Sequence, residues 1–509
     1  MADVAKAAIA ECLGGPHSQY RDLAHIKEAA AALYQTGACM LCVLRFLQIS
    51  FGPVYQQQLE SDITQELGIA ESETASNGRP PCPVCLGILC HGAVDQVVKK
   101  YQAEQFDARE VFIGVELPKS INVRHRAMQI HCWRNIPVLA PAADVADVKD
   151  TVKYMISQQL SRDAGVTIVG EGDMQVDVAF AHPESASDHK FLFDHAESTP
   201  APASKPTRGR RRGGPPGTDA GESKAAVIDA LAACSDAEFS ARYACPPPPV
   251  KSVAALSAVT LKRASLFIGG RYLKLERNIS QTPFVIEGRR VTEHSVAELV
   301  GEPIMRLTNC DSYNLVGSGR EDADVRMLGD GRPFYIECVN PRIGCPPSSQ
   351  VAGIEHEMVA RNSPVQVRSL QVIRPADTAV IKEGEESKTK HYCALVWIAK
   401  QLSAAQIAEI NEMGKHVVEL QQKTPVRVLH RRAPLTRPKR LLSLNIEHLE
   451  GLFYRVRIES EAGAYIKEFV HGDLGRTVPS LAEMAGATAD ILELDVEKVS
   501  LDFPPVHAN

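Results

Sequence analysis

One aspartate in the C-terminal half of the chain is a strong candidate for chemistry. Asp322 ends a Gly-Arg-Glu-Asp sequence, so its carboxylate has charged neighbours of both signs. Two apolar runs follow at 325–328 and 334–339, and the glycines and proline between them predict the turn of a β-hairpin. Catalytic groups often occupy loops that such a stiff scaffold positions. We therefore predict that Asp322 is catalytic; the alternative is a solvated turn residue.

Further motifs lie on both sides of Asp322, and they occur in the order of a known family. They read Ile-Gly-Gly-Arg-Tyr-Leu-Lys-Leu-Glu-Arg at 268–277, Gly-Arg-Glu-Asp-Ala-Asp-Val-Arg-Met-Leu-Gly at 319–329, Lys-His-Tyr-Cys-Ala-Leu-Val-Trp at 390–397, Gln-Lys-Thr-Pro-Val-Arg-Val-Leu-His-Arg-Arg at 422–432, and Gly-Ala-Tyr-Ile-Lys-Glu-Phe-Val-His-Gly-Asp-Leu-Gly-Arg-Thr at 463–477. This series resembles the archaeal and eukaryotic tRNA pseudouridine synthases of the Pus10 type, which act on the T-arm. Ala323 and Phe284 depart from the family pattern, and neither touches the proposed chemistry.

The resemblance implies a reaction and a role for three residues. Uridine in the tRNA T-loop, at position 54, 55 or both, would be isomerised to pseudouridine without an organic cofactor. Breaking the C–N glycosidic bond requires a carboxylate that acts as nucleophile or as base, and Asp322 would supply it. The family pattern places Lys467 beside Asp322 as a cation and Tyr392 against the extruded uracil. The alternatives are a solvated lysine and a half-buried strand tyrosine.

Positive charge is concentrated locally, although the chain as a whole has 56 Lys and Arg against 62 Asp and Glu. Residues 423–440 contain seven Lys and Arg and no acid, and a second basic cluster lies at 262–277. Such clusters neutralise RNA phosphates, although many are simply solvated faces. The prolines within 423–440 favour an extended loop. We predict RNA contacts for Arg271, Lys274, Arg320, Arg427, Arg431 and Arg432.

Two Cys-x-x-Cys pairs predict a metal site in the N-terminal region. Their members are Cys39, Cys42, Cys82 and Cys85, and four thiolates satisfy a structural Zn²⁺ ion with no open position. Cys12 and Cys90 are alternative ligands. Disulfides are less favoured, because 13 cysteines is an odd number and the chain shows no secretory signal. We therefore expect an intracellular protein, in the nucleus, the cytoplasm or both.

The composition, 44% hydrophobic and 23% charged, predicts two or three domains. The family resemblance implies a fold of the α+β class. Residues 1–195 would form a zinc-bearing α/β RNA-binding region that resembles a THUMP-containing module, with strands at 110–115 and 175–181 and a helix at 145–162. Residues 196–250, rich in Pro, Gly and Arg, would form a flexible linker with a short helix. Residues 251–509 would form a catalytic domain around a mixed, largely antiparallel sheet.

The partner predicted by this organisation is tRNA. No apolar run approaches the roughly 20 residues that span a bilayer, so we expect no membrane interaction. We expect a monomer, and the sequence identifies no protein partner. The competing function is a non-catalytic, zinc-containing RNA-binding or scaffold protein, because zinc knuckles and basic loops serve binding without chemistry.

Overall fold

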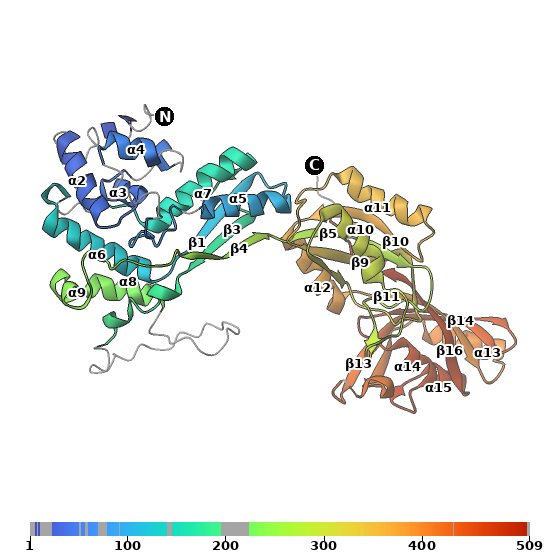
Figure 1. Cartoon of the computed structure of the whole chain (residues 1–509). Helices are drawn as coiled ribbons and strands as arrows, with labels where there is room; N and C mark the ends of the chain where they lie inside the picture. Colours follow the sequence, from blue (N-terminus) through green and yellow to red (C-terminus); the bar gives the residue numbers. More distant parts are fainter. Residues whose placement is uncertain are drawn as a thin grey trace. The chain divides into compact units, whose positions relative to one another are not determined.

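The computed structural model describes residues 6–7, 9–10, 23–49, 52–55, 60–69, 79–90, 92–139, 145–194, 223–430 and 432–505. The chain divides into two compact units, Met1–Lys262 and Arg263–Asn509 (Figure 1). Each unit has its own hydrophobic core. The division falls later than the expected start of the catalytic domain at residue 251. The reason is that strand β4 (Ala255–Arg263) belongs to the sheet of the N-terminal unit.

The N-terminal unit combines helices with a four-stranded sheet. Its described helices of more than one turn are α2 (Leu23–Gln35), α3 (Met40–Phe46), α4 (Glu60–Glu66), α5 (Ala93–Glu104), α6 (Ser120–Asn135), α7 (Val148–Ala164), α8 (Lys224–Ala233) and α9 (Asp236–Arg242). The sheet order is β2 (Thr167–Ile168), β1 (Glu110–Glu116), β3 (Met174–Ala181) and β4, and β1 runs parallel to both β2 and β3. The predicted strands and helix correspond to β1, β3 and α7. The THUMP-like character of this unit stays a prediction.

Part of the expected linker at 196–250 is folded. Helices α8 and α9 pack on α6, where Val227 and Phe239 are fully buried against α6 residues Val123, Ala127 and Ile130. Each helix begins with a serine cap, Ser223 or Ser235, whose hydroxyl accepts a backbone hydrogen bond. The apolar side chains of these helices lie at helical spacing and therefore form a small core. The Pro-, Gly- and Arg-rich composition of the flanking residues did not indicate it. The arginine-rich run at 208–212 lies outside the described residues.

The C-terminal unit is built on a ten-stranded sheet. Along its main path the order is β10 (Val365–Ile373), β5 (Leu266–Lys274), β9 (Arg326–Val339), β16 (Ala489–Val499), β11 (Lys390–Ile398), β14 (Phe453–Ser460), β13 (Thr436–Glu450), β12 (Val418–Lys423) and β15 (Thr477–Val478), and β8 (Ser312–Gly317) pairs with β9. Strands β9 and β16 are parallel, whereas the other pairs are antiparallel. This mixed, largely antiparallel sheet confirms the predicted α+β class.

Helices and a small hairpin complete the C-terminal unit. They are α10 (Val296–Thr308), α11 (Ser348–Ala360), α12 (Thr378–Ser387), α13 (Ala404–Met413), α14 (Ile466–His471) and α15 (Leu481–Ala485), with the hairpin β6 (Val285–Ile286) and β7 (Arg289–Arg290). Helix α11 lies against β10, and α14 lies against β16. None of the helices in the described residues is long and apolar enough to cross a membrane.

The hairpin predicted after Asp322 is wrong. Residues 326–339 form one continuous strand, β9, whose first residues pair with β16 and whose remainder pairs with β5 and β8. Gly329 and Gly331 have positive φ, but within the strand. A Cβ atom on Gly329 would lie 1.9 Å from the carbonyl oxygen of Glu497, and one on Gly331 would lie 2.7 Å from that of Tyr272. Close approach of neighbouring backbones therefore explains these glycines.

Candidate active site and metal site

Asp322 lies on the connection between β8 and β9, at residues 318–325. Its side chain is 43% exposed and borders a cavity of about 530 Å³. Six of the predicted site residues line this cavity: Arg320, Asp322, Tyr392, Arg427, Arg432 and Lys467. The structure therefore brings together residues more than a hundred positions apart in the sequence. Arg431 lies outside the described residues.

Two cations flank the carboxylate of Asp322. The Oδ2 atom lies 3.2 Å from NH1 of Arg427 and 3.3 Å from Nζ of Lys467. Lys467 is closer to Asp324, at 2.7 Å. Partial burial raises the pKa of Asp324, but the hydrogen bond and charge of Lys467 outweigh it, and that pKa is lowered overall. Lys467 thus holds two acids of one loop, and Asp322 is the one that borders the cavity.

Lys274, predicted to contact RNA, instead holds the Asp322 loop from inside. Its side chain is fully buried, and its Nζ atom donates to the carbonyl oxygens of Ile279, Asp322 and Ala323 at 2.8, 2.9 and 3.3 Å. Burial lowers its pKa to about 8, against the opposing effect of Glu321. A buried ammonium cannot neutralise an RNA phosphate, so this prediction is corrected. Lys274 positions the loop.

Glu321, next to Asp322, has a separate structural role. Its side chain is 2% exposed, and it accepts hydrogen bonds from Nε of Arg332 at 2.7 Å and from the hydroxyl of Tyr272 at 3.0 Å. Arg332 also donates to the carbonyl of Ser318, and Gln281 donates to that of Gly319. These partners fix Glu321 and the part of the loop that precedes it. Sequence reasoning missed them, because only the fold shows which charged side chains point inward.

Arg271 is a second correction. Its guanidinium donates to the carbonyl oxygens of Asp330, Gly331, Val499, Leu501 and Phe503. Burial lowers its pKa from the usual range, since the surrounding acids only partly oppose this effect. These hydrogen bonds use the five N–H donors of the guanidinium, so none is left for an RNA phosphate. Arg271 therefore joins β5 to β9 and to the C-terminal segment, and we remove it from the predicted RNA contacts.

Tyr392 forms part of the cavity wall. It lies on β11 between Ile458 of β14 and Val496 of β16. Burial raises the pKa of its hydroxyl, although nearby Arg332 and a hydrogen bond with Ser460 act in the opposite direction. The hydroxyl therefore remains protonated at neutral pH. The cavity lining that sequence reasoning missed includes Lys390, Tyr465, Leu494 and Val496.

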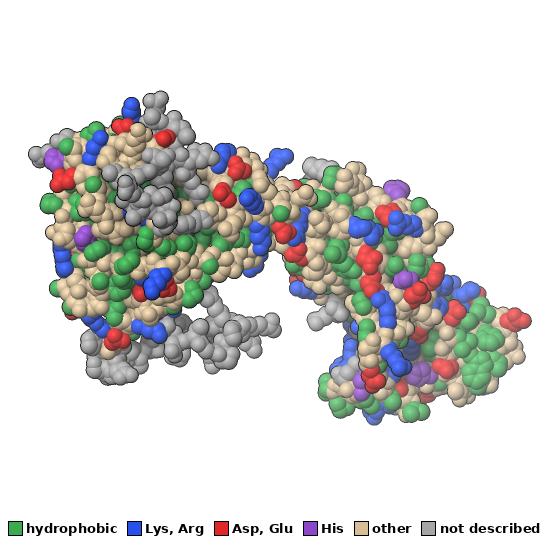
Figure 2. All heavy atoms as spheres, in the orientation of Figure 1, with side chains coloured by type: hydrophobic (Ala, Val, Ile, Leu, Met, Phe, Trp, Pro, Cys, Tyr) green, Lys and Arg blue, Asp and Glu red, His purple; other side chains and the backbone are tan. Residues whose placement is uncertain are grey.

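The basic segment at 423–440 is compensated by acids that lie elsewhere in the sequence. Arg427 forms a 2.7 Å ion pair with Glu468, and Arg440 forms a 3.0 Å pair with Glu461. Arg432 donates to the hydroxyl of Tyr465. Figure 2 likewise shows blue basic and red acidic side chains intermixed on the drawn face of the C-terminal unit. The segment is also only partly a loop, because it ends in β13.

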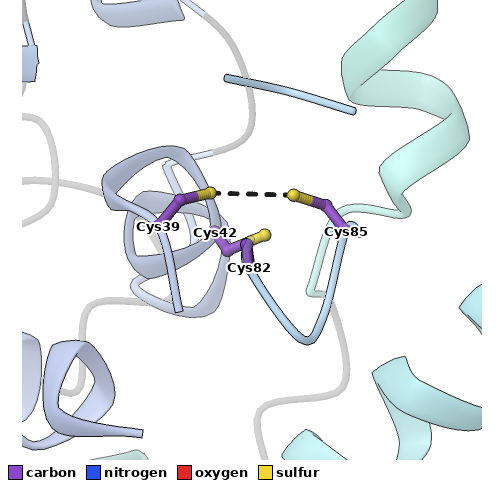
Figure 3. Close-up of side chains that lie close together, drawn as sticks. All are labelled: Cys39, Cys42, Cys82 and Cys85. Carbon is purple, nitrogen blue, oxygen red and sulfur yellow. Dashed lines mark hydrogen bonds between the residues drawn. The ribbon is translucent and has the colours of Figure 1, made fainter. Parts of the chain in front are cut away.

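The four predicted cysteines meet in the N-terminal unit (Figure 3). Their sulfur atoms all lie within 4.8 Å of one another, the residues are buried, and Sγ of Cys39 is 3.7 Å from Sγ of Cys85. Cys39 precedes α3 and Cys42 lies within it, whereas Cys82 and Cys85 belong to a tight turn. Of the alternative ligands, Cys90 is only partly buried and Cys12 lies outside the described residues.

The surroundings of these thiols fit a metal ion. Four thiols are the donor set of a closed tetrahedral site. Arg45, whose side chain is fully buried, donates to Sγ of Cys42 at 3.4 Å and would offset part of the negative charge of the thiolates. Arg45 is itself held by the carbonyl of Ala146 and by His125. The four residues could therefore hold one metal ion.

Comparison with known proteins agrees with this arrangement. The family description "Pus10, C-terminal" matches residues 267–500, and "Eukaryotic Pus10, N-terminal" matches residues 82–260. A tRNA pseudouridine synthase Pus10 of Mus musculus is 32% identical over 529 aligned residues, which cover 94% of this chain and 98% of the relative. This chain belongs to the Pus10 family. Its members are pseudouridine synthases, and the chain is accordingly an isomerase.

Archaeal members of the Pus10 family align with about half of this chain. The tRNA pseudouridine synthase Pus10 of Archaeoglobus fulgidus is 40% identical over 249 residues, covering 46% of this chain and 67% of the relative. Among solved structures, a Cbf5-Nop10-Gar1 complex aligns over 45% of this chain and 48% of that chain, with 16% identity and a TM-score of 0.26.

Proposed function

We propose that this Pus10 protein converts uridine to pseudouridine in the T-loop of tRNA, at position 54, 55 or both. The observation that carries the proposal is the cavity itself, which gathers Asp322, Tyr392 and Lys467 from three separate motifs. Its volume of about 530 Å³ leaves room for one nucleotide. A protein that only binds RNA would not require this set of side chains, so the geometry favours the enzyme over the scaffold.

Asp322 would act on the ribose of the target uridine, as nucleophile or as base. The reaction breaks the bond between C1′ and N1, turns the uracil, and joins C5 to C1′, after which C5 loses its proton and N1 gains one, so that the product is an isomer of uridine. The exposed part of the Asp322 carboxylate faces the cavity, while Lys467 holds the opposite charge against it. The buried donors of Lys274 and Gln281 prevent the loop from moving as the bonds change.

Tyr392 would orient the uracil during its rotation. Its ring offers an aromatic face for stacking, and its protonated hydroxyl can donate a hydrogen bond to a uracil oxygen. Leu494 and Val496 of β16 border the same cavity and provide an apolar surface beside it. These contacts would keep water away from the reacting ring while it is detached from the ribose.

RNA contacts would come from the cations that remain at the surface. Arg320 and Arg432 are exposed at the cavity, and Lys423 is exposed at the end of β12. Such side chains neutralise phosphates and orient the RNA, whereas the folded shape of the T-loop and the extruded base specify the target. Arg427 differs from these cations, because without RNA it is already paired with two acids.

We also propose that Cys39, Cys42, Cys82 and Cys85 hold a structural Zn²⁺ ion. When bound, the metal would supply folding free energy to the N-terminal unit and no catalytic step. The thiols lie in that unit and Asp322 in the other, so the metal would serve folding and the placement of RNA-binding surfaces.

Pseudouridine mapping of tRNA transcripts tests the function directly. The purified protein should modify T-loop uridines, and Asp322→Asn should abolish the product while RNA affinity stays within a few-fold. Asp324→Asn is the matched control, because it removes the neighbouring partner of Lys467 without altering the cavity lining. If Asp322→Asn retained turnover, or if Asp324 were essential in its place, the assignment of the catalytic residue would be wrong.

A further inference from the structure

Arg427 reaches the candidate catalytic carboxylate while it is anchored on a third residue. Glu468 lies on α14 directly after Lys467, and its side chain is 2% exposed. Its Oε1 atom accepts a hydrogen bond from Nε of Arg427 at 2.7 Å, while NH1 of the same guanidinium lies 3.2 Å from Oδ2 of Asp322. One planar cation therefore joins a buried acid to the acid at the cavity.

The buried acid depends on this cation. Among the described residues, the ion pair of Glu468 is made with Arg427, and its Oε2 atom is buried without a hydrogen-bond partner. A carboxylate taken out of water requires a nearby opposite charge. Glu468 therefore binds Nε of Arg427 strongly. The side chain of Asp322 is 43% exposed and competes with water for NH1, so its hydrogen bond to Arg427 is weaker.

The rest of the basic segment is held in place by hydrogen bonds that do not involve Arg427. The backbone N–H of Val426 donates to Asp473 at 3.2 Å, and Arg432 donates to the hydroxyl of Tyr465 at 2.9 Å. The side chain of Gln422 exchanges two hydrogen bonds with the backbone of Tyr465. The segment can therefore stay in place when the Arg427 tip leaves Asp322, so that only one guanidinium has to reorient.

We propose that Glu468 is a positioning residue that holds Arg427 across Asp322 before RNA binds and presents the same guanidinium to the RNA backbone afterwards. Carboxylate and phosphate oxygens accept the same charge-assisted hydrogen bonds from a guanidinium, so an arriving phosphate can replace Asp322 as the partner of NH1. The exchange uncovers one side of the Asp322 carboxylate when the target nucleotide enters. This inference rests on the proposed function for the identity of the arriving group.

A double-mutant cycle measures the coupling. Glu468→Gln keeps the shape of the side chain but removes its charge, and it should lower the single-turnover rate at saturating tRNA about tenfold while leaving RNA affinity within about twofold. In an Arg427→Lys background the same change should have little further effect. Glu461→Gln is the control, because it removes the partner of Arg440 in the same segment. Equal losses from Glu468→Gln in both backgrounds would overturn the proposal.

Chemical modification tests the free protein without using activity. Without RNA, Glu468→Gln should raise the rate at which phenylglyoxal modifies Arg427 about fivefold, because the guanidinium loses its charge-assisted anchor. Arg437 is the internal control: the rate at which phenylglyoxal modifies it, measured in the same mass spectra, should not change. An unchanged rate at Arg427 would overturn the proposal. If the wild-type protein modified no tRNA, the proposed function would fail, and this measurement would still decide whether Glu468 holds Arg427.

Discussion

Replacing Lys274 with methionine separates a positioning role from an RNA contact. Methionine has a similar length and no charge, so Lys274→Met removes three hydrogen bonds to the carbonyls of Ile279, Asp322 and Ala323. The Asp322 carbonyl keeps a second donor, the N–H of Val325, and each buried carbonyl left without a partner costs about 1–3 kcal/mol. The substitution also removes the cost of burying a charged ammonium group, which offsets several kcal/mol of this loss. We expect the C-terminal unit to lose about 2–4 kcal/mol of unfolding free energy, a large effect for one side chain.

The measurements are thermal unfolding, single-turnover kinetics and RNA titrations at several salt concentrations. Each kcal/mol lost should lower Tm by about 2–4 °C in a unit of this size. The reaction rate should fall because the Asp322 loop loses its inner support, whereas the slope of log K against log salt should not change. Lys262→Met is the matched control, since Lys262 is exposed in the same basic cluster and should change stability by less than about 0.5 kcal/mol.

The pH dependence of Lys274 follows from its lowered pKa. Burial brings the pKa to about 8 in the folded protein, compared with 10.5 as the ordinary value. Between these two pH values the unfolded chain keeps a proton that the folded protein has lost, so the unfolding free energy rises with pH. The difference between wild type and Lys274→Met should therefore be constant below about pH 8 and grow as pH increases toward 10. A salt slope reduced by about 0.7–0.9 with unchanged stability would refute the reasoning, because it would place Lys274 on RNA.

Three further predictions address the cavity wall, the metal and the surface cations. Tyr392→Phe should slow the reaction about 100-fold with little change in RNA affinity, and the raised pKa of Tyr392 predicts no loss of wild-type rate from pH 7 to 9 that is due to this hydroxyl. Elemental analysis should find one zinc per chain, and Cys82→Ser should lose it and lower the stability of the N-terminal unit; an unchanged metal content would exclude the site. Replacing Lys423, Arg432 and Arg437 with Gln should flatten the salt slope by up to about 0.7–0.9 per lost contact, while equal slopes would remove these residues from the binding surface.

The sequence was sufficient to predict the fold class and the meeting of residues from distant motifs. The family resemblance placed Asp322, Tyr392 and Lys467 in one site, and in the structure all three line the same cavity. The cysteine spacing alone predicted a four-thiol cluster, because two Cys-x-x-Cys pairs are efficient metal-binding turns. The roles of these residues and the identity of the metal stay predictions.

Buried charge was the feature that the sequence could not show. Lysines and arginines are usually exposed, so Arg271 and Lys274 were assigned to RNA together with their neighbours. In the fold both point at backbone carbonyls of β9, β16 and the Asp322 loop. The error with the hairpin has a related cause. Gly329 and Gly331 have positive φ, as a turn would require, but neighbouring backbones, not a reversal of the chain, impose it.

The Asp322 loop shows how neighbouring acids acquire different roles in one fold. Glu321 is 2% exposed and held by Arg332, Asp322 is 43% exposed at the cavity, and Asp324 is 61% exposed and held by Lys467. Lys274 holds the backbone at the point where the chain passes from the buried acid to the cavity. A shift of one residue along this loop would bury Asp322 and expose Glu321 to RNA. The inner hydrogen bonds of the loop therefore determine which of these carboxylates borders the cavity and, in the proposed reaction, can reach the ribose. This selection is what Lys274→Met should weaken.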